Sequence, residues 1–378
     1  MRRAPIFALE LLFGIALVGI VLFDVFETIV VPRRTESVLR LAPHVIILLW
    51  PIWRHIGVRL TPGWRREDFL GTFAPFVLVL VMISWVLALI LGFGLILHAL
   101  PDQIQPPLED FETALYLAGT SLLTVGFGDF VPVALGARVA VLVAAASGLA
   151  VLALVIALTF NLYGSFARRE MMVLMLEGRA GAPSSGVMLL ETFGRYKIVD
   201  ELSDTFKHFE LWTAEMLDSH LAYPILSFFR SSHDNLSWVS ALGAVLDAAT
   251  LLITAVEDDP HKLSDGLIRS RASARMVYTI GCHALVDLTQ LRFARRHLNT
   301  NNKHPGIERG EFEAACRQLR EAGYPTSCSE ESWQAFVQHR SVYAVHLNTL
   351  ARYFASPPTP WIGDRTVLTR LRPAHLGP

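Results

Sequence analysis

Charged residues are scarce in this chain. Asp, Glu, Lys and Arg make up 18% of its 378 residues, whereas soluble domains carry roughly 25%. Hydrophobic residues make up 52% and are concentrated before Tyr163, while the second half has an ordinary soluble composition. We therefore expect a membrane part followed by a soluble part. The formal net charge of −1 argues neither for nucleic acid nor for a polyacidic partner.

Cysteine is also scarce. Cys282, Cys316 and Cys328 all lie in the soluble half, and their odd number and wide spacing predict reduced thiols rather than a disulfide framework. Together with His220 and His283 they lack the spacing of metal ligands, so core or surface roles are expected and no metal site. The Gly-x-Gly-x-x-Gly motif is absent, so nothing supports a dinucleotide, and we expect no cofactor.

Long apolar runs are the main positive feature. They cover residues 6–31, 73–100 and 136–163. At about 1.5 Å per residue, each is long enough to cross a hydrocarbon core of about 30 Å. The first run follows two arginines, as in a signal peptide, but it exceeds the usual core of roughly 7–15 residues and no small-x-small cleavage site follows. We expect residues 1–32 to form an uncleaved span.

Acidic residues interrupt the first run. Glu10, Asp24 and Glu27 lie within or beside it. Acids inside a membrane are candidates for function, facing protein or water. The alternative, which we favour, places Asp24 and Glu27 near the cytoplasmic end of the span, paired with Arg33 or Arg34.

A glycine-punctuated hexapeptide lies between the second and third runs, after a short helical stretch over residues 111–122. Its residues are Thr124, Val125, Gly126, Phe127, Gly128 and Asp129. Glycine adopts positive φ without steric cost, so successive carbonyls can face one way instead of alternating as in a strand. Such carbonyls can replace the water shell of a cation. We expect the carbonyls of Thr124, Val125, Gly126 and Phe127 to be the ligands, although a glycine turn in an unrelated apolar protein is the alternative.

The sequence Thr-Val-Gly-Phe-Gly-Asp is the selectivity-filter signature of tetrameric potassium channels. Residues 73–170 resemble the bacterial two-span members of that family, in the order outer helix, pore helix, filter and inner helix. The resemblance implies an all-α membrane protein with a pore domain over residues 71–170. It also implies a homotetramer in the lipid bilayer, in which four filters form one ring and K⁺ is the permeant ion.

The resemblance also assigns roles on the third run. Gly148 lies where the family places its gating hinge. Four further residues should line the cavity and its inner mouth: Leu149, Leu152, Ile156 and Phe160. The alternative is that these side chains pack against the outer helix.

Three positions depart from the family pattern. Thr120 stands where a bacterial relative keeps a carboxylate behind the filter, and Leu123 replaces the usual threonine before Thr124. Phe127 replaces the commoner tyrosine and cannot donate a hydroxyl hydrogen bond. We expect Thr120 and Asp129 to support the filter, with packing that differs from that of the family.

The loops indicate the topology. The arginines of residues 33–70 are Arg33, Arg34, Arg40, Arg54, Arg59, Arg65 and Arg66. This density predicts a cytoplasmic loop, whereas residues 101–110 contain acids but no Lys or Arg and should lie outside. The N-terminus is then outside too. Residues 45–53 are apolar but short and contain Pro51, which favours an interfacial helix; if they cross instead, the N-terminus lies inside.

The soluble half predicts a helical cytoplasmic domain over residues 187–354, between a linker (171–186) and a tail (355–378). Its expected helices cover 200–220, 237–256, 264–298, 311–322 and 330–354. Gly323 is placed as a helix stop and Ser329 as a cap. Residues 238–256 are apolar enough for a further span, but Asp247 and the arginines that follow oppose this, so a buried bundle helix is expected.

These features favour a potassium channel subunit of the inner (plasma) membrane and not an enzyme. We expect the cytoplasmic domain to gate the channel in response to a ligand that the sequence does not identify. Alternatives are a weakly selective cation channel and a membrane-anchored scaffold with a vestigial pore. An enzyme in the soluble half is a third, since Asp218, His220 and Ser231 could be drawn as a hydrolase set. The first run lacks the periodic arginines of a voltage sensor.

Overall fold

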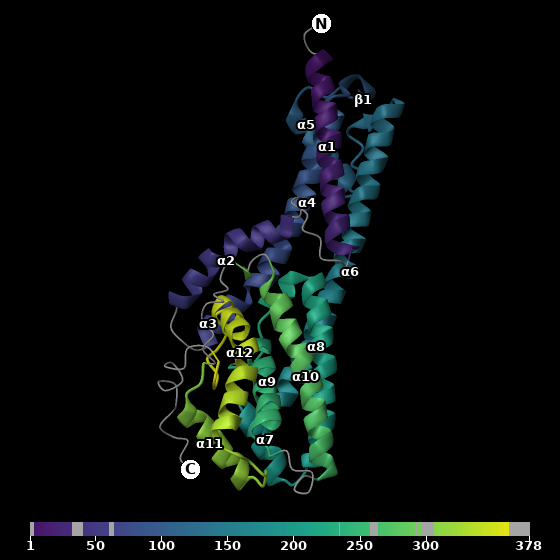
Figure 1. Ribbon diagram of the computed structural model, residues 1–378. Coiled ribbons are helices and arrows are strands. Elements are labelled where there is room, and N and C mark those ends of the chain that lie inside the picture. Colours follow the sequence, from purple (N-terminus) through teal and green to yellow (C-terminus); the bar gives the residue numbers. More distant parts are fainter. Residues whose placement is uncertain are drawn as a thin grey trace. The chain divides into compact units, whose positions relative to one another are not determined.

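The structure is a computed structural model that describes residues 4–31, 41–59, 64–233, 235–257, 264–291, 294–295 and 306–362. Helices make up most of these residues, and the sheet they contain has two strands (Figure 1). The chain divides into two compact units, the first formed by residues 1–49 and 74–163 and the second by residues 50–73 and 164–378.

The first unit contains the long apolar helices. Its elements are α1 (Ala4–Ile29), the first half of α2 (Leu41–Arg59), α4 (Phe73–His98), η1 (Pro101–Gln103), β1 (Ile104–Gln105), α5 (Phe111–Leu122), β2 (Val131–Pro132) and the first part of α6 (Leu135–Ala180). Among the described residues, α1, α2, α4 and α6 are long and apolar enough to cross a membrane. The prediction of an all-α membrane protein is confirmed.

Helix α5 begins where the sequence predicts. Asp110 is its N-cap, and the side chain accepts a hydrogen bond of 2.7 Å from the Thr113 N–H. This hydrogen bond lowers the pKa of the Asp110 carboxyl. The loop before α5 pairs with the loop after the hexapeptide, because β1 and β2 form an antiparallel ladder. Both ends of the irregular segment are therefore held by regular structure.

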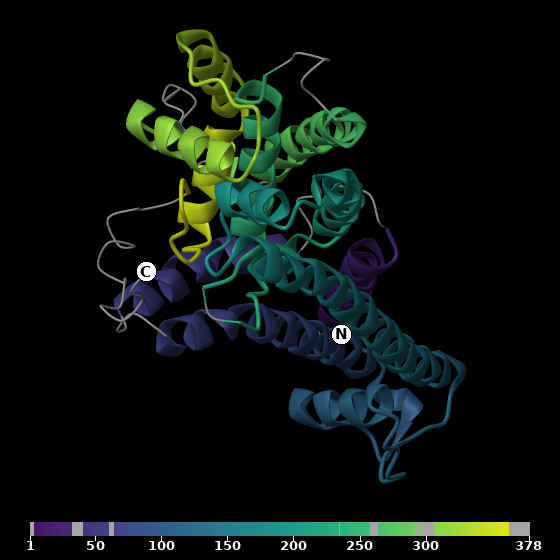
Figure 2. The same cartoon turned by 90° about the horizontal axis from the view of Figure 1, so that it is seen from below.

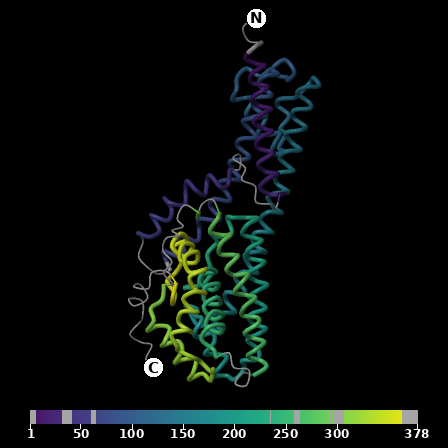
Figure 3. Tube along the Cα trace, viewed as in Figure 1, coloured from purple at the N-terminus to yellow at the C-terminus, as the bar shows by residue number. Residues whose placement is uncertain are grey.

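Helices α1 and α4 pack against each other in antiparallel directions. Near one end His98 Nδ1 lies 2.9 Å from a Glu10 carboxylate oxygen, and near the other Trp85 Nε1 donates to Asp24 at 2.6 Å. Between them the backbones approach so closely that a Cβ at Gly14 would lie 2.6 Å from the Gly92 carbonyl oxygen. Figure 3 traces the two helices side by side.

Asp24 has partners that the sequence did not predict. Its carboxylate accepts hydrogen bonds from Trp85 Nε1 and from the Leu41 N–H at 3.1 Å, the second at the start of α2. The proposed partners Arg33 and Arg34 lie outside the described residues. A buried acid on an apolar helix is thus satisfied by neutral donors.

The second unit is a helical bundle. Its elements are the second half of α2, α3 (Trp64–Gly71), the end of α6, α7 (Gly186–Arg195), η2 (Val199–Glu201), α8 (Leu202–Ala222), η3 (Pro224–Phe228), α9 (Trp238–Thr254), α10 (Asp265–Thr289), α11 (Arg309–Glu321) and α12 (Glu330–Tyr353). Helix α9 is central: every residue from Trp238 to Ile253 is buried, and α7, α10 and α12 pack around it. Apolar residues on all sides are expected of such a helix.

A buried ion pair fixes α12 on α9. Arg340 Nε donates to Asp247 Oδ1 at 2.9 Å, and the Tyr343 hydroxyl donates to the same oxygen at 2.6 Å. Burial, reinforced by Asp247, raises the pKa of Tyr343 well above its ordinary value, so the hydroxyl keeps its proton. Removing one member of such a pair would strand a buried charge, at a cost of roughly 3–5 kcal/mol.

Several helix boundaries differ from those predicted. Helix α6 continues to Ala180, through residues 171–180 that the sequence analysis gave to a linker (Figure 2). Val173 and Leu176 are buried on that extension, so packing as well as helix propensity extends it. Helix α7 was not expected. The helix expected over 264–298 ends at Thr289, and of the tail 355–378 only residues up to 362 are described.

Two predicted helix signals are confirmed. Gly323 has φ of +97° directly after α11, a conformation that glycine adopts readily. The Ser329 side chain accepts a hydrogen bond from the Ser332 N–H and caps α12. Helix α2 extends over 19 residues with Pro51 inside it, longer than the stretch 45–53 from which it was predicted.

Candidate functional site

The backbone of the hexapeptide alternates in handedness. Thr124, Gly126 and Gly128 have φ of 56°, 57° and 80°, whereas Val125 and Phe127 are not in the positive-φ region. In an ordinary extended strand φ is negative at every residue, and successive carbonyls point to opposite sides. When the sign of φ alternates, successive carbonyls can share a side.

The N–H groups of the hexapeptide point back to α5. Val125 N donates to the Thr120 carbonyl oxygen at 2.8 Å and Gly126 N to the same oxygen at 3.4 Å, while Thr124 N donates to Ser121 at 3.1 Å. Thr120 therefore supports the segment through its carbonyl, since its hydroxyl donates to Leu117.

The carbonyls remain available. Within the described part of the chain, no hydrogen bond ends on the carbonyl oxygens of Thr124, Val125, Gly126 or Phe127. All four residues are exposed in the single chain. Unsatisfied carbonyls in a row are suited to the coordination of a dehydrated monovalent cation.

An aromatic cluster behind the hexapeptide was missed from the sequence. The Tyr116 ring lies parallel to the Phe127 ring, with centroids 6.4 Å apart, and edge-on to Phe130 at 6.3 Å. The Asp129 carboxylate accepts from the Phe130 N–H at 3.2 Å. Tyr116 thus places an aromatic ring from α5 against Phe127 and Phe130. A tyrosine one helical turn before Thr120 was the available signal.

The residues predicted to line a cavity lie on α6. Leu149 and Leu152, with Thr124, line an apolar cavity of about 390 Å³ against α4. Ile156 and Phe160 lie further along α6 and are outside that cavity. The exposed fraction of these four α6 side chains is between 49% and 75%, so the single chain leaves them largely uncovered. Leu149 and Leu152 face the outer helix α4 across that cavity, and the pore-lining role of the four residues stays a prediction.

Gly148 makes a close contact between α6 and α5. A Cβ at this position would overlap the carbonyl oxygen of Leu122, at the last turn of α5. Glycine is required here because the two backbones touch. A hinge at Gly148 stays a prediction.

The other sequence candidates are engaged elsewhere. His220 lies 3.2 Å from Arg169 Nη1, and the Ser231 hydroxyl donates to Glu170, so each group is hydrogen-bonded to another residue and not to the other as a hydrolase set requires. Within the described residues there is no group of three or more His, Cys, Asp or Glu that could hold a metal ion.

Comparison with known proteins places the site in a class. Residues 85–164 match the model of a family described as "Ion channel". The match covers α4 from Trp85, α5, the hexapeptide and α6 as far as Gly164. No curated protein matches the chain, and no solved structure does. The match supports an ion channel, and with four membrane-length helices among its described residues the chain is a membrane protein.

The contact at Gly148 can be tested by substitution. We expect Gly148→Ala to lower the thermal stability of the purified protein in detergent, because overpacking against backbone costs roughly 1–3 kcal/mol. Gly178→Ala, on the same helix with open space around it, is the matched control. That control should keep or slightly raise the melting temperature. Equal melting temperatures for the two variants would refute the close contact.

Proposed function

We propose that this protein is a potassium-selective channel subunit that conducts K⁺ passively through a homotetrameric pore. The observation that carries the proposal is the alternating φ of the hexapeptide, with its four unbonded carbonyls. Fixed carbonyl dipoles can replace the hydration shell of K⁺. The family match at residues 85–164 and the filter signature both support this function.

The tetramer follows from the incompleteness of the site. One chain supplies one row of carbonyls, which cannot surround an ion. The Phe127 side chain is 70% exposed, and the α6 residues Leu149 and Phe160 are exposed as well. Neighbouring copies would cover these surfaces, and the resemblance to tetrameric channels sets their number at four.

Ion flux tests this function directly. Purified protein in liposomes is expected to pass potassium, with a reversal potential that follows the potassium gradient in mixed potassium and sodium. Gly126→Asp should abolish the flux, because a side chain at φ of +57° is strained and disturbs the carbonyls. Gly310→Asp, in the open first turn of α11, is the control and should conduct normally.

Two outcomes favour the alternatives. A reversal potential insensitive to the choice of potassium or sodium indicates a weakly selective cation channel. No flux from the unmutated protein, with intact folding and assembly, favours a membrane-anchored scaffold with a vestigial pore.

The packing of α1 on α4 supports one topology. If both helices span, their antiparallel contact puts the start of α1 and the end of α4 on one side of the membrane. The segment between them, residues 30–72, then leaves and returns on the other side. A crossing by α2 would need a second crossing before α4, and α3, with eight residues, is too short. We infer that α2 is interfacial and that the N-terminus lies outside.

Antibody and thiol labelling of intact cells tests this topology. An epitope tag before Ala4 and an Asp102→Cys variant should both be reached from outside, the latter by a membrane-impermeant maleimide. Arg65→Cys and the partly exposed native Cys282 and Cys328 should react only after permeabilisation, because the loop and the bundle are cytoplasmic. A tag that is protected while Asp102→Cys is labelled would overturn the arrangement.

Arg169 anchors the C-terminal extension of α6 to the helical bundle. This buried guanidinium donates to the carbonyls of Leu226, at 2.9 Å, and Phe229, at 2.7 Å. It also forms an ion pair with Glu170. A buried arginine with this many partners anchors the helix firmly to the η3 turn.

His220 is a further hydrogen-bond partner of Arg169, from which it accepts as a neutral imidazole. Its Nδ1 donates to the Met216 carbonyl at 2.7 Å, which leaves Nε2 to accept from Arg169. Burial, followed by the nearby Arg169 charge, lowers the pKa of His220 well below its ordinary value. The imidazole therefore stays neutral beside the guanidinium.

The same bundle holds the segment that leads into α4. Trp50 Nε1 donates to the Tyr353 carbonyl at 3.2 Å, and Arg54 donates to the Arg352 carbonyl at 3.0 Å. Both acceptors belong to the last turn of α12, whose carbonyls have no partner within the helix. Cationic donors are favoured at such a C-terminus.

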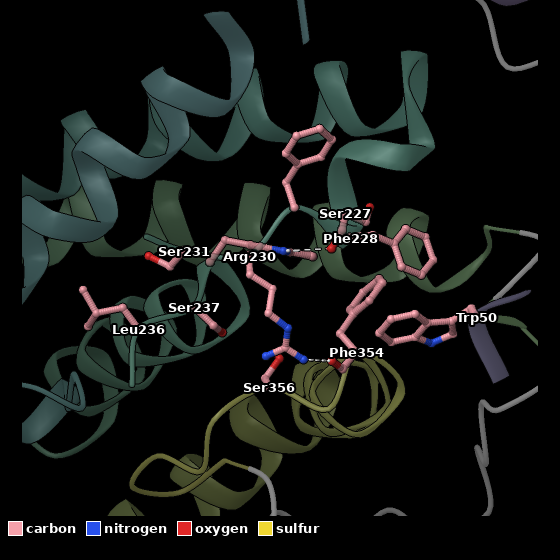
Figure 4. Close-up of a pocket in the computed structure, with 11 residues that line it drawn as sticks. Trp50, Ser227, Phe228, Arg230, Ser231, Leu236, Ser237, Phe354 and Ser356 are labelled. Atoms are coloured by element: carbon pink, nitrogen blue, oxygen red, sulfur yellow. Dashed lines mark hydrogen bonds between the residues drawn. The ribbon is translucent and has the colours of Figure 1, made fainter. Parts of the chain in front are cut away.

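Arg230 ties α3 to the same turn. It forms an ion pair with Glu67 and donates to the Phe354 carbonyl at 2.6 Å. Figure 4 shows its side chain reaching toward Phe354 and Ser356, beside a small cavity of about 20 Å³. Such a cavity has room for about one water molecule. The contacts of Arg230 thus join three separate segments of the bundle.

These anchors support gating through the bundle. The chain enters α4 from one anchored segment, and α6 ends in the other. A rearrangement of the bundle would therefore pull on both helices that flank the hexapeptide.

Substitution of Arg169 tests this coupling. Arg169→Gln removes donors from the Leu226 and Phe229 carbonyls, and we expect the open probability to change at least about fivefold, the lower range of coupling energies. The reversal potential should not change, because the filter is untouched. Arg168→Gln, exposed on the same helix, is the control. An unchanged open probability in a folded, assembled Arg169→Gln channel would argue against gating through the bundle.

A further inference from the structure

Two cysteines that the sequence separates lie together in the bundle. Cys316, on α11, has its Sγ 3.9 Å from the Ser327 carbonyl oxygen, next to Cys328. Arg320, one helical turn beyond Cys316 on α11, donates to Cys328 Sγ at 3.4 Å and to the Thr326 carbonyl at 3.2 Å, so Cys328 lies against the end of α11 that carries Cys316. Both cysteines are reduced in this structure. The third cysteine, Cys282, is on α10.

Backbone contacts hold the second thiol in place. The Thr326 hydroxyl donates to the Cys316 carbonyl at 3.2 Å. On the other side, Ser327 N donates to the Ala255 carbonyl and Glu257 N to the Pro325 carbonyl, both at 2.8 Å. The segment with Cys328 therefore pairs with the end of α9, and its approach to α11 is built into the fold.

The two thiols differ in accessibility. Cys316 is fully buried, and burial together with Cys328 raises its pKa to about 12. Cys328 is partly exposed and accepts a hydrogen bond of 3.4 Å from Arg320 Nη2. A partly exposed sulfur beside a guanidinium is the one that a small oxidant reaches first. Cys316 lies behind it as the resolving thiol.

We propose that Cys316 and Cys328 are a redox-responsive modification site that closes to a disulfide when a hydroperoxide oxidises it. The Cys328 thiolate attacks one oxygen of hydrogen peroxide, the O–O bond breaks, and sulfenic acid and hydroxide form. The Cys316 thiol then attacks the sulfenic sulfur. The S–O bond breaks, the Cys316 proton leaves with the oxygen as water, and the S–S bond forms.

The electron balance closes without another cofactor. The two sulfurs lose two electrons, and the peroxide gains them and becomes two molecules of water once the released protons are counted. Oxidised glutathione gives the same product by thiol–disulfide exchange and releases two molecules of glutathione. The bond would tie α11 to the segment that pairs with α9.

Oxidation of the full-length protein in detergent tests the proposal. The protein is treated with hydrogen peroxide or oxidised glutathione, remaining thiols are alkylated, and its peptides are analysed by mass spectrometry. We expect a Cys316–Cys328 linked peptide, with Cys282 alkylated. The linkage should persist in Cys282→Ser and be absent in both Cys316→Ser and Cys328→Ser. Cys316→Ser should stop at a sulfenic acid or a glutathione adduct on Cys328, because the resolving thiol is missing.

A comparison with unfolded protein separates built-in proximity from chance collision. The linkage should form at least about tenfold faster in the native protein than in the same protein unfolded in denaturant. Arg320→Gln should slow the native reaction. Three alkylated thiols after oxidation, or a linkage that forms as fast in the unfolded chain, would overturn the proposal. Neither outcome bears on ion conduction, which is measured separately.

Discussion

One backbone oxygen holds the irregular segment of this protein in place. The Thr120 carbonyl accepts hydrogen bonds from two successive N–H groups of the hexapeptide, so these polar groups are satisfied on the side of α5 and the carbonyls are left to the other side. Non-helical backbone at membrane depth is tolerated only where protein or a water-filled cavity surrounds it. The contact of Gly148 with α5 and the Tyr116 cluster both serve this requirement, because they fix the helix that carries Thr120.

Much of this arrangement was readable from local sequence. Run length and continuous apolar composition predicted α1, α4 and α5 closely, and Asp110 marked the start of α5, because capping and hydrophobic length are local properties. The positive φ of Gly126 and Gly128 was predicted for the same reason. Thr124 also has a positive φ, although it is not glycine. The hydrogen bonds of the Val125 and Gly126 N–H groups to the Thr120 carbonyl explain this conformation.

What the sequence could not predict depends on contacts between distant residues. The pairing of Asp24 with Trp85 requires that α1 lie antiparallel to α4, and nothing in either helix alone specifies a neighbour. The proximity of Cys316 and Cys328 depends on a turn that is held by the end of α9. The sequence did not predict the extension of α6 over residues 171–180, because the composition changes at Met171 and this was interpreted as the start of a linker. In the structure one face of this segment, with Val173 and Leu176, is buried, and the helix continues through it.

The length of α6 has a consequence for its solvation. Its 46 residues form one continuous helix, which at about 1.5 Å per residue measures about 69 Å, more than twice the thickness of a hydrocarbon core. If α6 crosses the membrane near the bilayer normal, the hydrocarbon core encloses less than half of it. The remaining turns must then meet water or other parts of the protein, so one helix has to satisfy two different solvents along its length.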